Sequence, residues 1–192
     1  MRRQTKNKNS VIVSNGWKYP NHTTEIQKQL LAEQNAICAY TETYLGRTDK
    51  KEIEHFNPTL KNTEQDGYQN WFLVKAQWNN EKGSAPRWLK HQPLIHPTAN
   101  DFEDRIIYLD GEYICDPEDE EADKLIKYLK LNDEELTADR KNYIERRREA
   151  INNRNITAQE YFDSLFEKEP NRVYFIRAIE TEFAITIQFV KN

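Results

Sequence analysis

The apolar residues near the start of the chain follow helical spacing. Ile26, Leu30 and Leu31 form one stripe behind a capping box, which predicts a helix over about 24–35. Residues 1–20 ahead of this helix are mostly polar and basic, and we expect this N-terminal arm to be loosely held apart from one short apolar run. The pattern therefore predicts that the first stable element follows residue 20.

The next segments change to a strand-like pattern and then back to a helical one. Segments 37–45 and 52–56 are rich in β-forming residues and flank a polar turn, which predicts a β-hairpin. The polar stretch 57–69 is expected to be a loop. Bulky apolar residues at helical spacing then predict a helix over about 70–82, ended by Gly83. The predicted order is strand, strand, helix.

The second half of the chain begins with one more hairpin and continues with helical spacing. Segments 106–109 and 112–114 flank an Asp-Gly pair, which predicts a hairpin with a two-residue turn. Helical spacing then predicts four helices, placed at about 125–131, after Asn132-Asp133, at about 157–166 and after Pro170, although 183–187 also alternates as a strand would.

These elements predict an α+β fold. A ββα core over residues 21–90 follows the arm of residues 1–20. The hairpin and a mostly helical C-terminal lobe occupy residues 91–192, and we expect this lobe to form one compact unit with the core. The length of 192 residues suits one such unit.

Composition narrows the class of protein. Hydrophobic residues make up 37% of the chain, charged residues 31% and aromatic residues 11%, which is polar but not typical of a disordered chain. No apolar run is long enough to span a membrane, and the basic start lacks the apolar stretch of a secretory signal. With only Cys38 and Cys115 there is no disulfide framework. We therefore expect a soluble cytoplasmic protein.

Charge is clustered along the chain. The net charge of −4 is not that of a general nucleic-acid binder. A basic arm at 2–8, an acidic block at 116–123 and a basic stretch at 140–148 nevertheless stand out. Each can be an ordinary solvated surface. Alternatively, the basic segments contact phosphate and the acidic block faces a partner protein.

Four side chains carry the candidate chemistry. Glu54-His55, then Asn70, then Asn79 followed by a Lys-Gly pair, form the order of an HNH nuclease motif. Glu54 and Asn79 offer oxygen ligands to one Mg²⁺ or Mn²⁺ ion. His55 can take a proton from the attacking water. Asn70 can hold the loop that carries His55.

The members of this set are weak signals when taken singly. A lone histidine such as His55 or His96 is more often structural, and a lone Asn70 is a good helix cap. The prediction depends on the ordered set. The cations nearest to it along the chain are expected to contact phosphate, namely Lys82, Lys75 and Arg47.

Longer segments carry a closer resemblance: Ile37–Glu42, Ile53–Pro58, Asn70-Trp71 and Gln77–Gly83. They resemble the PtuB family, the HNH nucleases of Septu anti-phage systems and of some retrons. The likeness extends over most of residues 24–150. It implies a ββα-metal (HNH) core, the roles given above for Glu54, His55, Asn70 and Asn79, and an ATPase partner, PtuA, that controls the nuclease.

The chain departs from this family at a zinc site. Many relatives carry two Cys pairs, whereas the positions here are Cys38 with Thr41, and Lys75 with Trp78. One thiol cannot form a four-ligand zinc site. We therefore expect no structural zinc, and we expect Cys38 to be a small buried hydrophobe.

The resemblance implies metal-dependent cleavage of nucleic acid, with DNA favoured, by the effector subunit of an anti-phage complex. An RNA- or tRNA-cleaving effector remains an alternative, because phosphate contacts carry no base information. A non-catalytic subunit that regulates the ATPase is the other alternative. We expect the C-terminal half, from about Asp116 onward, to dock on the ATPase through its acidic block, and a homodimer is possible.

Overall fold

The computed structural model describes residues 1–189. The elements are, in order, α1 (Val11–Ser14), α2 (Thr23–Glu33), β1 (Lys51–His55), η1 (Pro58–Leu60), η2 (Tyr68–Asn70), β2 (Trp71–Lys75), α3 (Ala76–Lys82), α4 (Ala85–Lys90), α5 (Phe102–Arg105), β3 (Ile107–Leu109), β4 (Glu112–Ile114), α6 (Glu120–Tyr128), α7 (Glu134–Arg154), α8 (Ala158–Lys168), η3 (Pro170–Arg172) and α9 (Ile176–Phe183). Within these residues, helices predominate and the strands form two small antiparallel sheets, as expected for an α+β fold.

The central sheet pairs β1 with β2, so the predicted helix over 70–82 is wrong in its first part. The strands are antiparallel, with Ile53 opposite Leu73 and His55 opposite Trp71. All four residues from Trp71 to Val74 are buried. A strand that is covered on both faces carries a continuous apolar run, which periodicity cannot distinguish from a buried helix.

The predicted first hairpin is also wrong, because residues 37–45 form a compact loop. Within this segment the only β-type pairing is the isolated bridge between Ile37 and Tyr44. Glu42 has a φ of 57°, and the Cys38 N–H donates to the Thr43 carbonyl at 2.9 Å, so the chain turns back early. The loop still lies beside β2, since the Ala39 N–H donates to the carbonyl of Leu73 at 3.1 Å.

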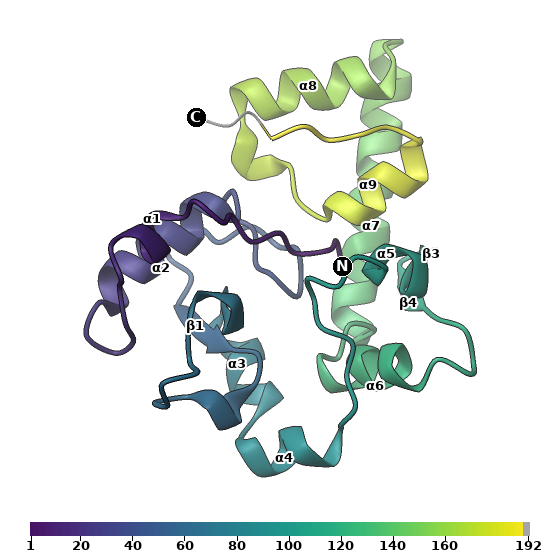
Figure 1. Cartoon of the computed structure of the whole chain (residues 1–192). Helices are drawn as coiled ribbons and strands as arrows, with labels where there is room; N and C mark the ends of the chain where they lie inside the picture. The colour runs from purple at the N-terminus through teal and green to yellow at the C-terminus, as the bar shows by residue number, and fades with distance from the viewer. Residues whose placement is uncertain (190–192) are drawn as a thin grey trace.

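The order strand, strand, helix is nevertheless present, formed by β1, β2 and the short helix α3. Helix α3 begins directly after β2 and ends at Gly83, which has a φ of 82°. A glycine is favoured there because the left-handed region strains residues that carry a Cβ atom. Figure 1 shows α3 beside β1, with α4 below them.

The second half has the predicted hairpin and the predicted helices in the predicted order, but two helices are misplaced. Helix α6 spans Glu120–Tyr128 and not about 125–131, and the last helix, α9, begins only at Ile176. The hairpin of β3 and β4 turns at Asp110 and Gly111, whose φ values are 43° and 83°. Helices α6, α7 and α8 begin where side chains cap them, with Asp119, Asp133 and Thr157 each accepting a backbone N–H. Helix α9 ends at Phe183, and residues 185–189 form no strand. In Figure 1, α7 reaches from the region of α6 to that of α8 and α9.

Residues 1–20 pack against the rest of the chain, so the expectation of a loose arm is wrong. Met1 is buried, and the segment contains helix α1. The ammonium group of Lys6 donates to the carbonyl of Trp71 and lies 4.1 Å from the ring centroid of Phe72. Burial lowers the pKa of Lys6 to about 7. The arm therefore completes the cover of the central sheet.

Glu42 joins the core to the C-terminal lobe. This residue is 2% exposed. Its carboxylate accepts the hydroxyl of Tyr113 on β4 at 2.7 Å and the N–H of Arg177 on α9 at 3.3 Å. Its carbonyl accepts the N–H of Phe175 at 2.9 Å. One loop residue thus contacts elements that lie far apart along the chain.

No helix within residues 1–189 combines the length and the apolar character needed to cross a membrane.

Candidate functional site

His55 ends β1 and is only 4% exposed. Its Nε2 atom lies 3.0 Å from the Oδ2 atom of Asp66, although the two are not aligned as a regular hydrogen bond. The Tyr19 ring meets the imidazole edge-on, with centroids 4.7 Å apart. Burial, which outweighs the nearby carboxylate, lowers the pKa of His55. The ring is therefore neutral at pH 7 and able to accept a proton.

Asp66 is the residue that the sequence reasoning missed. It is 6% exposed, and its Oδ1 atom accepts the indole N–H of Trp71 at 2.8 Å and the amide of Asn70 at 3.1 Å. The chain shows it only as one polar residue among many in the loop 57–69. What identifies Asp66 as a candidate is its closeness to His55, and the two residues come together only when the chain folds.

Asn70 holds the loop that follows His55. Its Oδ1 atom accepts the N–H of Asn57 at 2.7 Å, and its Nδ2 atom donates to the carbonyl of the same residue at 3.1 Å. The side chain is 6% exposed, so these bonds are shielded from water. This geometry is the one expected for a residue that fixes the His55 loop.

Glu54 points away from His55, into the core. Its side chain is fully buried. One carboxylate oxygen accepts a hydrogen bond from the ammonium group of Lys82, and the other accepts one from the hydroxyl of Tyr40. Burial raises the pKa of Glu54, and the charge of Lys82 opposes that rise. Both oxygens are therefore already engaged by protein donors.

The predicted metal site requires Asn79 to lie beside Glu54, and in the structure it does not. Its Nδ2 atom instead donates to Oε2 of Glu52 at 2.8 Å. Across residues 1–189, no group of three or more His, Cys, Asp or Glu side chains is placed to hold a metal ion. A divalent cation such as Mg²⁺ needs oxygen ligands that converge on one point. The residues as arranged do not fit Mg²⁺ or Mn²⁺.

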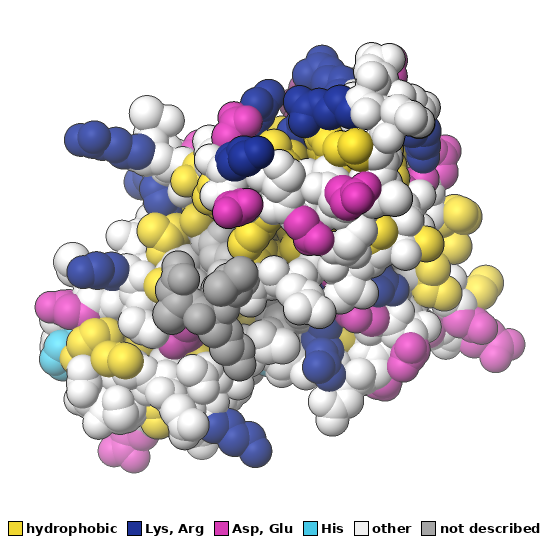
Figure 2. Space-filling view, turned by 90° about the horizontal axis from the view of Figure 1, so that it is seen from above, with side chains coloured by type: hydrophobic (Ala, Val, Ile, Leu, Met, Phe, Trp, Pro, Cys, Tyr) yellow, Lys and Arg dark blue, Asp and Glu magenta, His cyan; other side chains and the backbone are white. Residues whose placement is uncertain are grey.

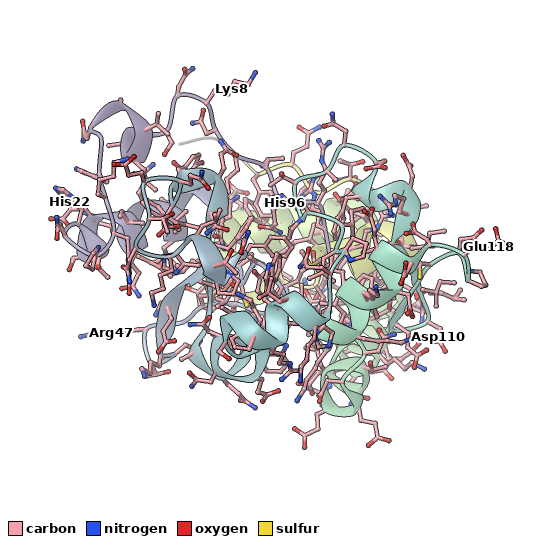
Figure 3. The ribbon with its side chains drawn as sticks, turned by 60° about the horizontal axis from the view of Figure 1, so that its bottom comes forward. Lys8, His22, Arg47, His96, Asp110 and Glu118 are labelled. Carbon is pink, nitrogen blue, oxygen red and sulfur yellow. The ribbon has the colours of Figure 1, made fainter. Side chains whose placement is uncertain are left out.

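The three predicted phosphate contacts lie in different settings. Lys82 is 4% exposed and its ammonium group is paired with Glu54, although the residue also borders the pocket that His55 lines. Lys75 is partly exposed and lies 3.6 Å from Asp49. Figure 3 shows Arg47 projecting outward at the edge of the molecule. Of the three, Arg47 is the most open to a polyanion.

A pocket of about 410 Å³ opens over His55. Its polar lining includes Lys61, which is exposed, together with Asn79, Asn80 and Ser84. A larger hollow of about 610 Å³ lies between β4 and α6, where no histidine lines it. We assign the candidate site to the smaller pocket, because a neutral imidazole beside a cation is suited to act on an anionic ester.

Comparison with protein-family models, curated proteins and solved structures finds no match to this chain.

The basic stretch at 140–148 contains one buried arginine, whereas Lys141 and Arg146 are exposed and the side chain of Arg148 is 40% exposed. Arg140 is fully buried and donates to the carbonyls of Gly111 and Leu131. Arg148 pairs with Glu182 at 3.0 Å. Figure 2 shows Lys and Arg side chains interspersed with Asp and Glu side chains over the face seen from above. This mixture favours a solvated surface over a phosphate-binding patch.

Cys38 and Thr41 lie at two of the positions where the resemblance would place zinc ligands. Cys38 is fully buried among apolar residues, as predicted. The Thr41 hydroxyl lies 2.7 Å from that of Thr43. His96 contacts Thr98 through Nδ1 at 2.8 Å and packs against the ring of Phe56 with centroids 4.8 Å apart, which fits a structural role.

Proposed function

We propose that this chain hydrolyses phosphodiester bonds of nucleic acid, with His55 as the general base. The observation that carries the proposal is a buried, neutral histidine that faces a carboxylate on one side and a pocket on the other. A neutral imidazole takes the proton from the attacking water. Lys61 at the pocket is a cation that can neutralise a phosphate oxygen.

The resemblance to the PtuB family supports this class of reaction. The strand–strand–helix order of β1, β2 and α3, the acid-His pair at the end of β1 and the asparagine on α3 agree with the family's motif. On this basis we propose an HNH endonuclease that favours DNA. We further propose that it is the effector subunit of a cytoplasmic anti-phage complex with a PtuA-like ATPase.

The proposal assigns no reaction step to the divalent metal ion that HNH nucleases use. In HNH nucleases a divalent cation supplies charge neutralisation at the phosphate. Here Glu54 is held by Lys82, and Asn79 is held by Glu52. His55, which holds and moves the proton, bonds neither Glu54 nor Asn79 through its side chain.

The test is a cleavage assay with the purified chain, alone and with its ATPase. Supercoiled DNA, single-stranded RNA and tRNA serve as substrates, each with Mg²⁺, with Mn²⁺ and with EDTA. We expect nicking of DNA that is lost in His55→Ala and kept in His22→Ala, a control at the edge of the molecule (Figure 3). Equal cutting by His55→Ala and the parent would refute the proposed base.

A non-catalytic regulatory subunit is the second candidate, because the metal set of the family is not assembled. This candidate predicts that none of the substrates is cut, while the chain still alters ATP hydrolysis by the partner. The RNA and tRNA arms of the same assay decide the substrate within the nuclease class.

A further inference from the structure

We propose that Asp66 is a positioning residue that orients His55 and selects its reactive tautomer. This inference rests on the proposed function, since it concerns the same histidine. Asp66 comes from the loop that precedes η2, eleven positions after His55. Its role is to act through the imidazole and not on the substrate.

The two nitrogens of His55 lie in different surroundings. Nε2 is fully enclosed and lies 3.0 Å from Oδ2 of Asp66. Nδ1 makes no hydrogen bond within residues 1–189 and, unlike Nε2, is not fully enclosed by protein atoms. His55 also lines the pocket. The carboxylate therefore lies next to Nε2, which leaves Nδ1 as the nitrogen that can act on a group in the pocket.

The carboxylate of Asp66 is fixed in this orientation. Its other oxygen, Oδ1, accepts the indole N–H of Trp71 at 2.8 Å and the amide of Asn70 at 3.1 Å. All three side chains are buried, so water cannot easily replace these bonds. Rotation of the carboxylate would break both contacts, which leaves Oδ2 directed at His55.

This geometry decides which nitrogen carries the proton. A carboxylate is negatively charged and only accepts hydrogen bonds. Its position 3.0 Å from Nε2 therefore favours the tautomer with hydrogen on Nε2, even though the two atoms are not aligned as a regular hydrogen bond. The lone pair is then on Nδ1, at the pocket. Nδ1 takes a proton from water, the hydroxide oxygen bonds to phosphorus, and the bond from phosphorus to the leaving oxygen breaks. The leaving oxygen takes a proton from solvent and becomes an alcohol, and Nδ1 later returns its own proton to solvent.

The charges around the ring make the carboxylate important. Lys61 and Lys82 line the pocket together with His55, whereas the carboxylate of Asp66 lies 3.0 Å from the Nε2 atom of that histidine. The imidazolium that forms during the reaction would otherwise lie among cations in a buried site. Asp66 supplies the opposite charge, as the aspartate does in hydrolytic triads.

The first experiment reads the tautomer directly and needs no catalysis. In ¹⁵N–¹H spectra of the unaltered protein at pH 7, we expect His55 to be neutral with hydrogen on Nε2. In Asp66→Asn, the amide can donate to Nε2, so the hydrogen should move to Nδ1. An Nδ1–H tautomer in the unaltered protein, or no change in Asp66→Asn, overturns the proposal.

The second experiment reads the rate. We expect Asp66→Asn to lower kcat by about 10²–10⁴-fold with KM little changed, whereas Glu64→Gln, which removes an exposed acid of the same loop, keeps the parent kcat. Parent-like cleavage by folded Asp66→Asn contradicts the role. If no substrate is cut at all, the proposed function fails, and the tautomer measurement still decides the role of Asp66.

Discussion

The ammonium group of Lys82 on α3 donates a hydrogen bond to the carboxylate of Glu54 on β1, and both side chains are buried. The same ammonium group donates to the carbonyl of His55 at 2.6 Å, while Tyr40 donates to the second oxygen of Glu54. The acid beside the candidate base therefore belongs to an internal ion pair. That pair ties the helix to the strand that carries His55.

Replacing Lys82 should lower the stability of the fold, because the buried carboxylate of Glu54 would lose its cation. We expect Lys82→Met to lower the free energy of unfolding by about 3–5 kcal/mol, because Glu54 would remain buried without its cation. Urea denaturation monitored by circular dichroism measures this change. Lys127→Met is the matched control, since Lys127 is 70% exposed and pairs with Asp123, and its loss should cost less than about 1 kcal/mol. Glu54→Gln added to Lys82→Met should recover most of the loss, and no recovery would argue against the ion pair.

Cleavage should stay fast at mildly acidic pH. Burial lowers the pKa of His55 below its ordinary value of about 6.5, and only the neutral ring is a base. Because burial lowers this pKa to about 4, the rate should fall only as pH drops toward 4, on the acid side of an ordinary histidine. The linked stability has the same sign, because the unfolded chain binds the proton first as pH falls below about 6.5. A rate that halves at or above pH 6.5 in a pH series on the unaltered protein would contradict this prediction.

Asn70→Ala should loosen the loop that follows His55. The change leaves the N–H and carbonyl of Asn57 without partners, so we expect a loss of about 1–3 kcal/mol in the free energy of unfolding. Cleavage should fall as well, because His55 precedes the loosened segment. Gln69→Ala is the control, since Gln69 is exposed in the same turn. Equal stability of the two variants would show that Asn70 does not hold the loop.

The acidic block divides into exposed acids and acids that the fold uses. Asp119 caps α6, and together with Glu121 it binds Arg105, with distances of 2.6–2.8 Å. Glu118 and Glu120 are exposed. We expect Glu118→Lys with Glu120→Lys to weaken co-purification with the ATPase and to leave the melting temperature nearly unchanged. Undiminished co-purification at raised salt would show that the block is not the docking surface.

The preparation should carry no stoichiometric zinc. Cys38 is buried, and the other positions where the sequence resemblance would place zinc ligands hold Thr41, Lys75 and Trp78. Elemental analysis of the purified chain, before and after dialysis against EDTA, measures the content. One tightly held zinc ion per chain would mean that other side chains form a site.

Local signals in the sequence were enough for the second half of the fold. Asp110-Gly111 is a turn sequence whose preference for positive φ is met, and Asp119, Asp133 and Thr157 cap helices in place. Such signals depend on neighbours along the chain. They remain valid whatever packs around them.

The central sheet could not be predicted in the same way. Trp71 and Val74 have helical spacing, yet they belong to a strand whose two faces are both buried. The true partner of β1 is decided by packing across the core and not by the turn that follows segment 37–45. The ion pair of Glu54 and the contact of Asp66 with His55 are likewise long-range, so the motif could identify the candidate residues but not their partners.

The contacts of Glu42 affect the point during synthesis at which its loop can reach the folded conformation. Its carboxylate and carbonyl obtain their partners from Tyr113, Phe175 and Arg177, the last two of which emerge late from the ribosome. Until then a buried acid lacks its hydrogen bonds, which disfavours closure of the loop against β2. A nascent chain that has passed Gly83 therefore holds every residue of the motif without yet holding a finished site. The proposed site would therefore be completed only after Phe175 and Arg177 have been synthesised, well after the last residue of the motif at Gly83.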